Sequence, residues 1–172
     1  MLANADLRVR PAEPCDEEDL VEVCRQIHQE TGLRDAAGDP FPFDECKVRA
    51  MVQQVTTPRR NDPTAAHAFC GIIGPYGDIQ ASIYLTRAET WSSSRPYLKQ
   101  EWSFVRPDHM KGPHARTLVA FSKVMAECWE QTLVGSLMTH NRIEAKKRFY
   151  AREYQVEPFG AFFVYNHPTQ GA

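Results

Sequence analysis

The stretch VRPDHMKGPHARTL, residues 105 to 118, decides the fold of this chain. Val105 ends a β-rich run, a polar loop containing Gly112 and Pro113 follows, and apolar residues then recur at helical spacing from Ala115. Proline suits the first position of a helix, because the N–H group that it lacks has no intrahelical partner there. The stretch therefore predicts a strand, a loop and a long helix that packs on a sheet. The apolar face of this helix should carry Ala115, Leu118, Phe121, Met125 and Cys128.

Apolar alternation and turn residues predict the elements on either side of this junction. Upstream we first expect a strand over residues 7–11, a helix capped by Asp16 that ends at Gly32, and a second helix over 45–54. A hairpin of strands over 67–73 and 79–85 should follow. A polar loop over 86–96 then leads to a strand over 97–105. Downstream we expect a strand over 133–138, a helix over 142–152 and a last strand over 159–165. A strand–helix–strand crossover makes the strands over 97–105 and 133–138 parallel. The predicted class is α/β, with a mixed, mostly antiparallel sheet flanked by helices, in one domain over residues 1–172.

Charge, cysteine usage and hydropathy argue against several classes of protein. The 172 residues carry a formal net charge of −2, which gives no overall attraction to nucleic acid or to an anionic membrane. Five cysteines form no C-x-x-C pair, and Cys24 and Cys128 fall on apolar helical faces, as buried reduced thiols do. No apolar run reaches the ~20 residues that span a bilayer, and the first residues lack the apolar core of a secretory signal. We expect a cytoplasmic protein without a membrane partner.

The element order and the central loop resemble those of the GNAT superfamily of N-acyltransferases. The central loop of that family has the pattern [Q/R]-x-x-G-x-[G/A], and its backbone N–H groups bind the pyrophosphate of acyl-CoA at a helix N-terminus, where unpaired donors and the helix dipole attract anions. An ungapped match places Val105 and Pro107 on the family's V-x-P. It also places Met110 at the Gln/Arg position, Pro113 at the first glycine and Ala115 at the last position, so the loop is a divergent version of the pattern.

A second match covers residues 142–165, RIEAKKRFYAREYQVEPFGAFFVY. This segment is similar to a GNAT subgroup, common among phage and prophage genes, that carries a K-x-R-x-Y-x-R helix followed by G-A-F-F. In many GNAT enzymes a tyrosine on this helix protonates the departing thiolate of CoA, and by position that residue is Tyr150. The family's usual asparagine two turns earlier is replaced by Ile143.

The resemblance implies acetyl-CoA as acyl donor, no metal, and a set of site residues. The predicted donor contacts are the backbone of Phe104 and Val105 for the pantetheine amides, and Lys111, Gly112, His114, Ala115 and Arg116 for the phosphates. Tyr150 is the predicted acid and Glu101 the predicted base. A strand period of two places Lys99, Glu101 and Ser103 on one face of the strand.

Each assignment has a simpler structural alternative. Glu101 can be an exposed strand carboxylate paired with a lysine, Tyr150 an amphipathic residue at the edge of the core, and His114 a plain first-turn residue. The basic residues of the 142–152 helix favour a solvated face over a contact with the 3′-phosphate of CoA. Trp91 and Tyr97 can line an acceptor cleft or pack locally. The histidines show no metal-ligand spacing.

The sequence thus predicts an N-acetyltransferase that transfers an acetyl group from acetyl-CoA to a primary amine by direct attack. The acceptor stays open among a small metabolite, a peptide N-terminus and a lysine side chain, and the sequence also leaves a homodimer open. The alternative is a non-catalytic acyl-CoA-binding or protein-interaction module on the same fold.

Overall fold

The sheet is mixed and mostly antiparallel, as predicted. In the computed structural model, which describes residues 7–34, 39–57, 67–137 and 142–158, five strands pair in the order β1-β2-β3-β4-β5. They are β1 (Arg10–Pro11), β2 (Ala68–Ile73), β3 (Ala81–Thr90), β4 (Ser93–Val105) and β5 (Leu133–Gly135). The first four are mutually antiparallel, and β5 is parallel to β4. The crossover through the helix after residue 113 explains this parallel pair.

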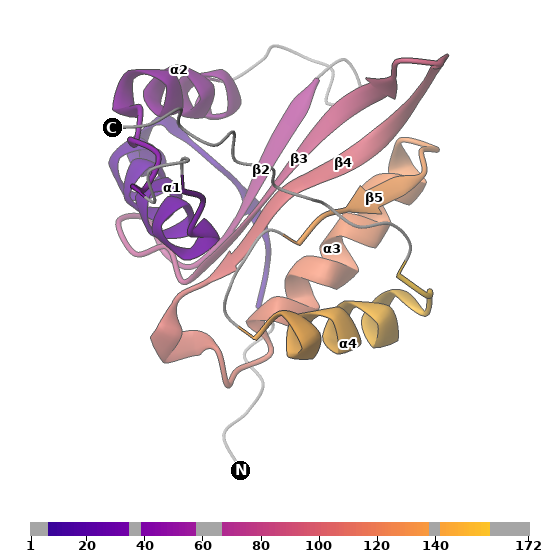
Figure 1. The fold of residues 1–172 in the computed structure, drawn as a ribbon. Coiled ribbons are helices and arrows are strands. Elements are labelled where there is room, and N and C mark those ends of the chain that lie inside the picture. The colour runs from indigo at the N-terminus through magenta and orange to yellow at the C-terminus, as the bar shows by residue number, and fades with distance from the viewer. Residues whose placement is uncertain (1–6, 35–38, 58–66, 138–141, 159–172) are drawn as a thin grey trace, which may run out of the picture.

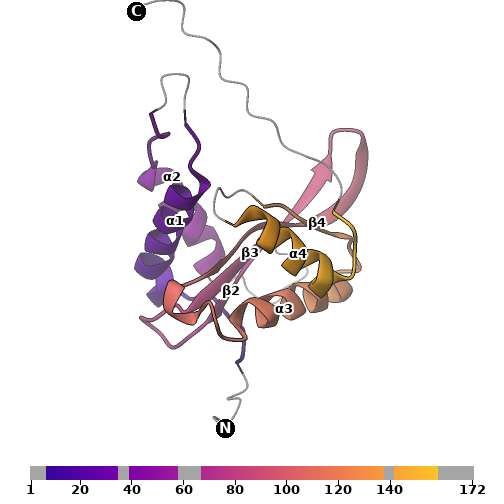
Figure 2. The ribbon, with the colours of Figure 1, turned by 60° about the horizontal axis from the view of Figure 1, so that its bottom comes forward.

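Two helices cover each face of the sheet (Figures 1 and 2). One face carries α1 (Glu17–Thr31) and α2 (Glu45–Thr56), and the other carries α3 (His114–Cys128) and α4 (Ile143–Tyr154). Short 3₁₀ turns, η1 (Pro14–Asp16) and η3 (Pro107–His109), precede α1 and α3. None of the described helices is long and apolar enough to cross a membrane.

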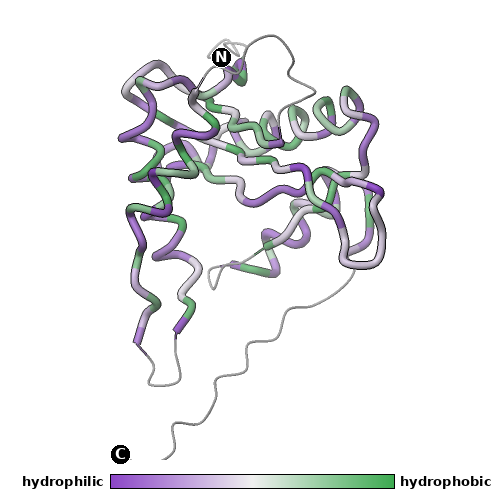
Figure 3. Tube along the Cα trace, turned by 90° about the horizontal axis from the view of Figure 1, so that it is seen from above, coloured by the Kyte–Doolittle hydropathy of each residue, from purple (hydrophilic) through white to green (hydrophobic). Residues whose placement is uncertain are grey.

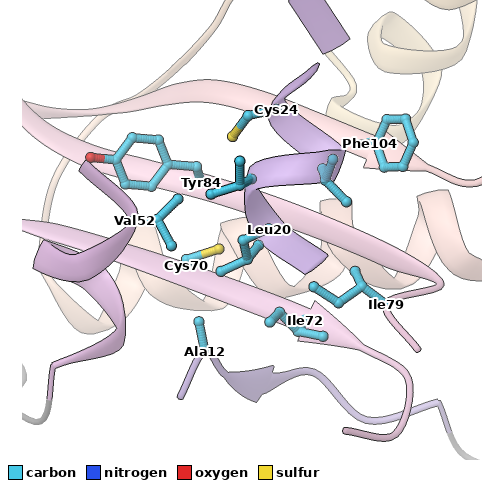
Figure 4. Close-up of a cluster of buried hydrophobic side chains, with 11 residues drawn as sticks. Ala12, Leu20, Cys24, Val52, Cys70, Ile72, Ile79, Tyr84 and Phe104 are labelled. Carbon is cyan, nitrogen blue, oxygen red and sulfur yellow. The ribbon is translucent and has the colours of Figure 1, made fainter. Parts of the chain in front are cut away.

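The sheet separates two apolar clusters. Leu20 and Cys24 of α1 point toward Cys70 of β2 and Tyr84 of β3 on one side (Figure 4). Leu118 of α3 packs on the other side, in a cluster with Ile73, Ala81, Ile83, Leu85 and Leu98. Apolar and polar residues alternate along the helices (Figure 3), as expected for helices that pack on a sheet by one stripe.

Several predicted boundaries were wrong. The predicted loop over 86–96 is instead a long hairpin, because β3 continues to Thr90 and β4 begins at Ser93. The prediction treated the polar threonines and serines here as loop residues, but their backbone groups form the hydrogen bonds of a β-ladder whatever the polarity of the side chains. Trp91 lies at the tip, 99% exposed, and so does not line a cleft. The strand at residue 133 ends at Gly135, and the predicted last strand over 159–165 lies outside the described residues.

The first helix begins after Asp16 and ends before Gly32, as predicted, but Asp16 does not make the expected capping hydrogen bond. Its buried carboxylate instead accepts two hydrogen bonds from the Arg10 guanidinium, both at 2.7 Å, and one from the N–H of Glu13 at 2.9 Å. The pair joins β1 to the start of α1. Cys24 is buried as predicted, whereas Cys128 is exposed at the end of α3.

Candidate functional site

The parallel pair β4 and β5 opens into a fork. Their ladder joins Leu98 to Leu133 and ends at Gln100 opposite Gly135, whereas β4 continues to Val105. Among the described residues, no strand pairs with β4 beyond Gln100 on this side. The backbone of β4 from residue 101 to 105 therefore has groups on this edge that can bind an amide-containing ligand.

A β-bulge lies at the point where the fork opens. Tyr84 of β3 pairs with Trp102 and Leu85 pairs with Gln100, so Glu101 is one extra residue on β4. The bulge interrupts the alternation of side chains between the two faces of the sheet. Gln100 and Ser103 consequently lie on the face of α3 and α4, since their partners Leu85 and Ile83 belong to that cluster. The predicted common face of Lys99, Glu101 and Ser103 was therefore wrong for Ser103.

Glu101 lies on the opposite face, that of α1 and α2. Its carboxylate accepts a hydrogen bond from the Thr86 hydroxyl at 2.8 Å and forms an ion pair with the Lys99 ammonium, also at 2.8 Å. The simpler alternative for Glu101, a strand carboxylate paired with a lysine, is therefore observed. Because the side chain is only partly exposed, these two partners fix where its oxygen atoms lie.

The N-terminus of α3 lies beyond the end of β4 and has no side-chain cap. Pro113 stands at the cap position and provides no capping hydrogen bond. The first N–H groups of α3, on His114, Ala115 and Arg116, lack intrahelical acceptors because of their position. They point with the positive end of the helix dipole toward the loop, an arrangement that suits an anion.

Gly112 and His114 shape the loop before this helix. The Gly112 N–H donates to the carbonyl of His109 at 2.9 Å. A Cβ at position 112 would lie 2.9 Å from His114 Nδ1, so only glycine fits beside the imidazole. His114 itself is buried, and its Nε2 lies 3.0 Å from the Gln80 side-chain oxygen. Burial, and then the charge of His109, lower the pKa of His114. The His114 side chain packs against the loop, while its backbone N–H remains one of the unpaired donors at the start of α3.

Two predicted phosphate ligands are cationic residues near this helix end. Lys111 is exposed in the loop. The Arg116 side chain is 67% exposed, and its Nε lies 3.4 Å from the Glu153 carboxylate at the end of α4. Arg152 shares that carboxylate at 2.7 Å. The Glu153 carboxylate thus partly neutralises the charge of the Arg116 guanidinium.

A mostly apolar cavity of about 540 Å³ lies between the β4–β5 pair, α3 and α4. Its polar residues include Gln100, Lys123, Ser136, Tyr150 and Tyr154. Burial raises the pKa of the Tyr150 hydroxyl, and hydrogen bonds with Ser103 and Gln100 act in the opposite direction. The phenol is therefore neutral near pH 7 and able to donate a proton into the cavity.

Comparison with known proteins identifies the fold. No family model and no curated protein matches the sequence. Solved structures do match: a possible acetyltransferase from Clostridium difficile 630 has 14% identity and a TM-score of 0.65, covering 94% of this chain and 97% of its own. An aminoglycoside acetyltransferase from an uncultured soil metagenomic sample has 9% identity, a TM-score of 0.66 and coverage of 95% and 98%. A predicted acetyltransferase with acetyl-CoA from Clostridium acetobutylicum has 10% identity and a TM-score of 0.66, and the match covers 93% of this chain and 96% of that chain.

The chain has the GNAT fold. At these identities the comparison establishes the architecture and assigns no residue a role. Within that fold, the predicted site residues lie at three places. Phe104, Val105 and the loop residues 111–116 lie on β4 and at the start of α3, whereas Tyr150 lies on α4, beside the cavity. Glu101 lies at the fork on the far face of β4.

The sequence interpretation missed three polar residues, Gln100, Ser122 and Tyr154, that meet beside this cavity. Gln100 is only 2% exposed, and its Oε1 accepts a hydrogen bond from the Tyr154 hydroxyl at 2.9 Å. The Ser122 hydroxyl of α3 lies 3.0 Å from the same tyrosine oxygen. A glutamine inside an otherwise apolar strand period and a serine within the apolar face of a helix were the available signals, because buried polar groups need partners.

Proposed function

We propose that this chain is an N-acetyltransferase that transfers an acetyl group from acetyl-CoA to a primary amine. The observation that carries the proposal is the juxtaposition of the β4–β5 fork, the uncapped start of α3 and the cavity at Tyr150. Each of these features has a matching part in acetyl-CoA: amides for a free strand edge, a pyrophosphate for a helix end, and a thioester for a proton donor. We also propose that residues 1–172 form one domain that acts in the cytoplasm.

The donor-binding residues would act mainly through the backbone. The β4 backbone at Phe104 and Val105 would hold the pantetheine amides, and the N–H groups of His114, Ala115 and Arg116 would hold the phosphates. Lys111 and the Arg116 guanidinium add positive charge at the same helix end. This charge matters here because Pro113 has no N–H and the Gly112 N–H already donates to His109.

The chemistry needs a base for the acceptor nitrogen and an acid for the departing thiolate, and the two candidate residues lie on opposite faces of β4. Glu101 would accept a proton from the ammonium group of the acceptor, directly or through water, on the face of α1 and α2, so that the neutral amine can attack the thioester carbonyl carbon. The Tyr150 hydroxyl would donate its proton to the departing thiolate on the face of α4. Both residues would act near the fork, where the pairing of β4 with β5 ends. Direct attack fits this arrangement, since the amine would form its bond to the carbonyl carbon from the side of Glu101, and the CoA thiolate would leave on the side of Tyr150.

The acceptor class is proposed only as a primary amine. One structurally similar protein is named as an aminoglycoside acetyltransferase, which supports a small-molecule acceptor. Glu101 pairs with Lys99, so both charges would lie on the side of the fork that we assign to the acceptor. A primary amine would compete with Lys99 for the carboxylate, and this favours an acceptor that arrives positively charged.

The loop before α3 favours a second candidate function, acyl-CoA binding without catalysis. Two of its backbone donors are lost, one to proline and one to an internal hydrogen bond, so a module that binds acyl-CoA without turnover is the alternative. Calorimetry with CoA together with an assay of thiol release from acetyl-CoA, using a panel of amines, separates the two functions. Amine-dependent thiol release supports the enzyme, and CoA binding without release supports the module. Absence of CoA binding would contradict both.

A further inference from the structure

Tyr154 connects three elements at one point beside the cavity. Its hydroxyl, at the end of α4, lies 2.9 Å from Gln100 Oε1 of β4 and 3.0 Å from Ser122 Oγ of α3. Ser122 also donates to the carbonyl of Val119 at 2.8 Å, which fixes it on its helix. Lys123 donates to the carbonyl of Glu153, the residue before Tyr154. These contacts hold the C-terminal turn of α4 against both β4 and α3.

Tyr150 lies one turn before Tyr154 on the same face of α4. The two rings are stacked, with centroids 5.8 Å apart and an angle of 15° between their planes. Residues four apart on a helix are neighbours, so any movement of the Tyr154 end of α4 also moves Tyr150. Both side chains line the cavity together with Gln100.

The carboxamide of Gln100 has two chemically different ends. Its oxygen accepts a hydrogen bond from the Tyr154 hydroxyl. Burial raises the pKa of Tyr150, but a hydrogen bond with Gln100 acts in the opposite direction, as a donor to the phenol oxygen does, so the NH₂ end is the part that faces Tyr150. Burial raises the pKa of Tyr154 to about 12, so its hydroxyl keeps this proton at neutral pH. Ser103 hydrogen-bonds with Tyr150 as well, and this contact acts on the pKa of Tyr150 in the same direction as that of Gln100. With both partners acting as donors to its oxygen, the proton of Tyr150 is free to point elsewhere.

We propose that Gln100 and Tyr154 are positioning residues that hold Tyr150 with its hydroxyl proton directed into the cavity. The inference rests on the proposed function, because it assumes that Tyr150 gives this proton to a leaving thiolate. Without the hydroxyl of Tyr154, the carboxamide of Gln100 can turn over. Its oxygen would then accept a hydrogen bond from the Tyr150 hydroxyl, and the proton of Tyr150 would no longer point toward the departing thiolate.

The test compares Tyr154→Phe with wild type and with a control, Tyr76→Phe. The Tyr154→Phe change keeps the ring and its stacking and removes only the hydroxyl. The control removes an exposed tyrosine hydroxyl, bonded to Glu13, away from the cavity. For Tyr154→Phe we expect kcat to fall about tenfold, the effect of one lost hydrogen bond, with the KM for acetyl-CoA unchanged. The control should retain both constants. An unchanged kcat in Tyr154→Phe would overturn the proposal.

A second readout does not depend on turnover. The ionisation of Tyr150 is followed by phenolate absorbance, as the difference between each protein and the same protein carrying Tyr150→Phe. The midpoint should move to higher pH in Tyr154→Phe, because an oxygen of Gln100 facing Tyr150 stabilises the neutral phenol. The other titratable residues at the cavity, Lys123, Glu127, Lys147 and Glu157, are the same in every variant. A midpoint that does not move would overturn the positioning role even if the wild type has no activity.

Gln100→Met provides a further variant of similar size in case Tyr154→Phe disturbs folding. It removes the donor that faces Tyr150 but leaves no carboxamide oxygen to hold the Tyr150 proton, so kcat should fall by no more than in Tyr154→Phe. Thermal unfolding of each variant shows whether the protein is still folded. If the wild type releases no thiol but the Tyr150 midpoint shifts as expected, the proposed function fails while the positioning role stands.

Discussion

Tyr150 carries the most specific chemical role at the scale of single residues. Its hydroxyl is neutral, lies at the cavity and can donate a proton. We predict that Tyr150→Phe lowers kcat by about 10²- to 10⁴-fold, the usual effect of losing a general acid, with little change in acetyl-CoA affinity. Steady-state kinetics and calorimetry on the same preparation measure the two quantities. An unchanged kcat would remove Tyr150 from the mechanism.

Glu101 is the second residue with a testable role. As the base, it must be ionised to act, so its protonation should produce the acidic limb of the kcat/KM profile. We predict that Glu101→Gln removes this limb and lowers kcat/KM across the profile. Glu89→Gln, an exposed carboxylate on the neighbouring strand β3, is the matched control and should leave the profile unchanged. If Glu101→Gln keeps the wild-type pH dependence, the ion pair with Lys99 is only structural.

At the scale of elements, the junction between β4 and α3 has to bind phosphates with few loop donors. We predict that Lys111→Ala/Arg116→Ala weakens CoA binding by about one hundred-fold, since charge-assisted hydrogen bonds are worth ~1.5 to 3 kcal/mol each. Calorimetry with CoA and with dephosphorylated pantetheine measures this. The loss should be confined to CoA. Equal CoA affinities of wild type and double variant would show that this helix end binds no phosphate.

The elements also show how far the sequence could predict the structure. Helical periodicity located α1, α2, α3 and α4 to within a few residues, and the crossover rule predicted the parallel pair. The bulge at Glu101 was missed, because an extra residue in a strand leaves no mark in a single sequence. The two-residue period therefore assigned Ser103 to the wrong face. Tyr154 was missed as well, since its partners Gln100 and Ser122 are distant in sequence and meet only in the fold.

At the scale of the whole molecule, the Arg10–Asp16 pair ties the first strand to the first helix. Burial alone would raise the pKa of Asp16, but the hydrogen bonds from Arg10 and Glu13 and the charge of Arg10 outweigh it and lower this pKa. A lowered folded-state pKa means that the carboxylate stabilises the fold above its unfolded pKa of about 3.9. This contribution is lost as the pH falls below that value.

We predict that Asp16→Asn lowers the free energy of unfolding by about 3 kcal/mol at pH 7, because it leaves a partly buried Arg10 without its counter-ion. The loss should shrink as the pH falls through the acid range, where wild type loses the same contribution. Urea unfolding from pH 7 to pH 3 measures both effects. Glu18→Gln, which breaks a surface pair with Arg49, should change stability little at any pH. Equal stability of Asp16→Asn and wild type at pH 7 would contradict the assignment.

At the same scale, the β4–β5 fork is proposed to hold acetyl-CoA while a primary amine attacks its thioester. The most direct test is to incubate the protein with isotopically labelled acetyl-CoA and a panel of primary amines, and to analyse both products and protein by mass spectrometry. The account predicts labelled N-acetyl amine in amounts that match the free CoA released, with no label on the protein, and loss of product in Tyr150→Phe. Persistent absence of any acetylated amine while CoA binds tightly would contradict the acetyltransferase assignment.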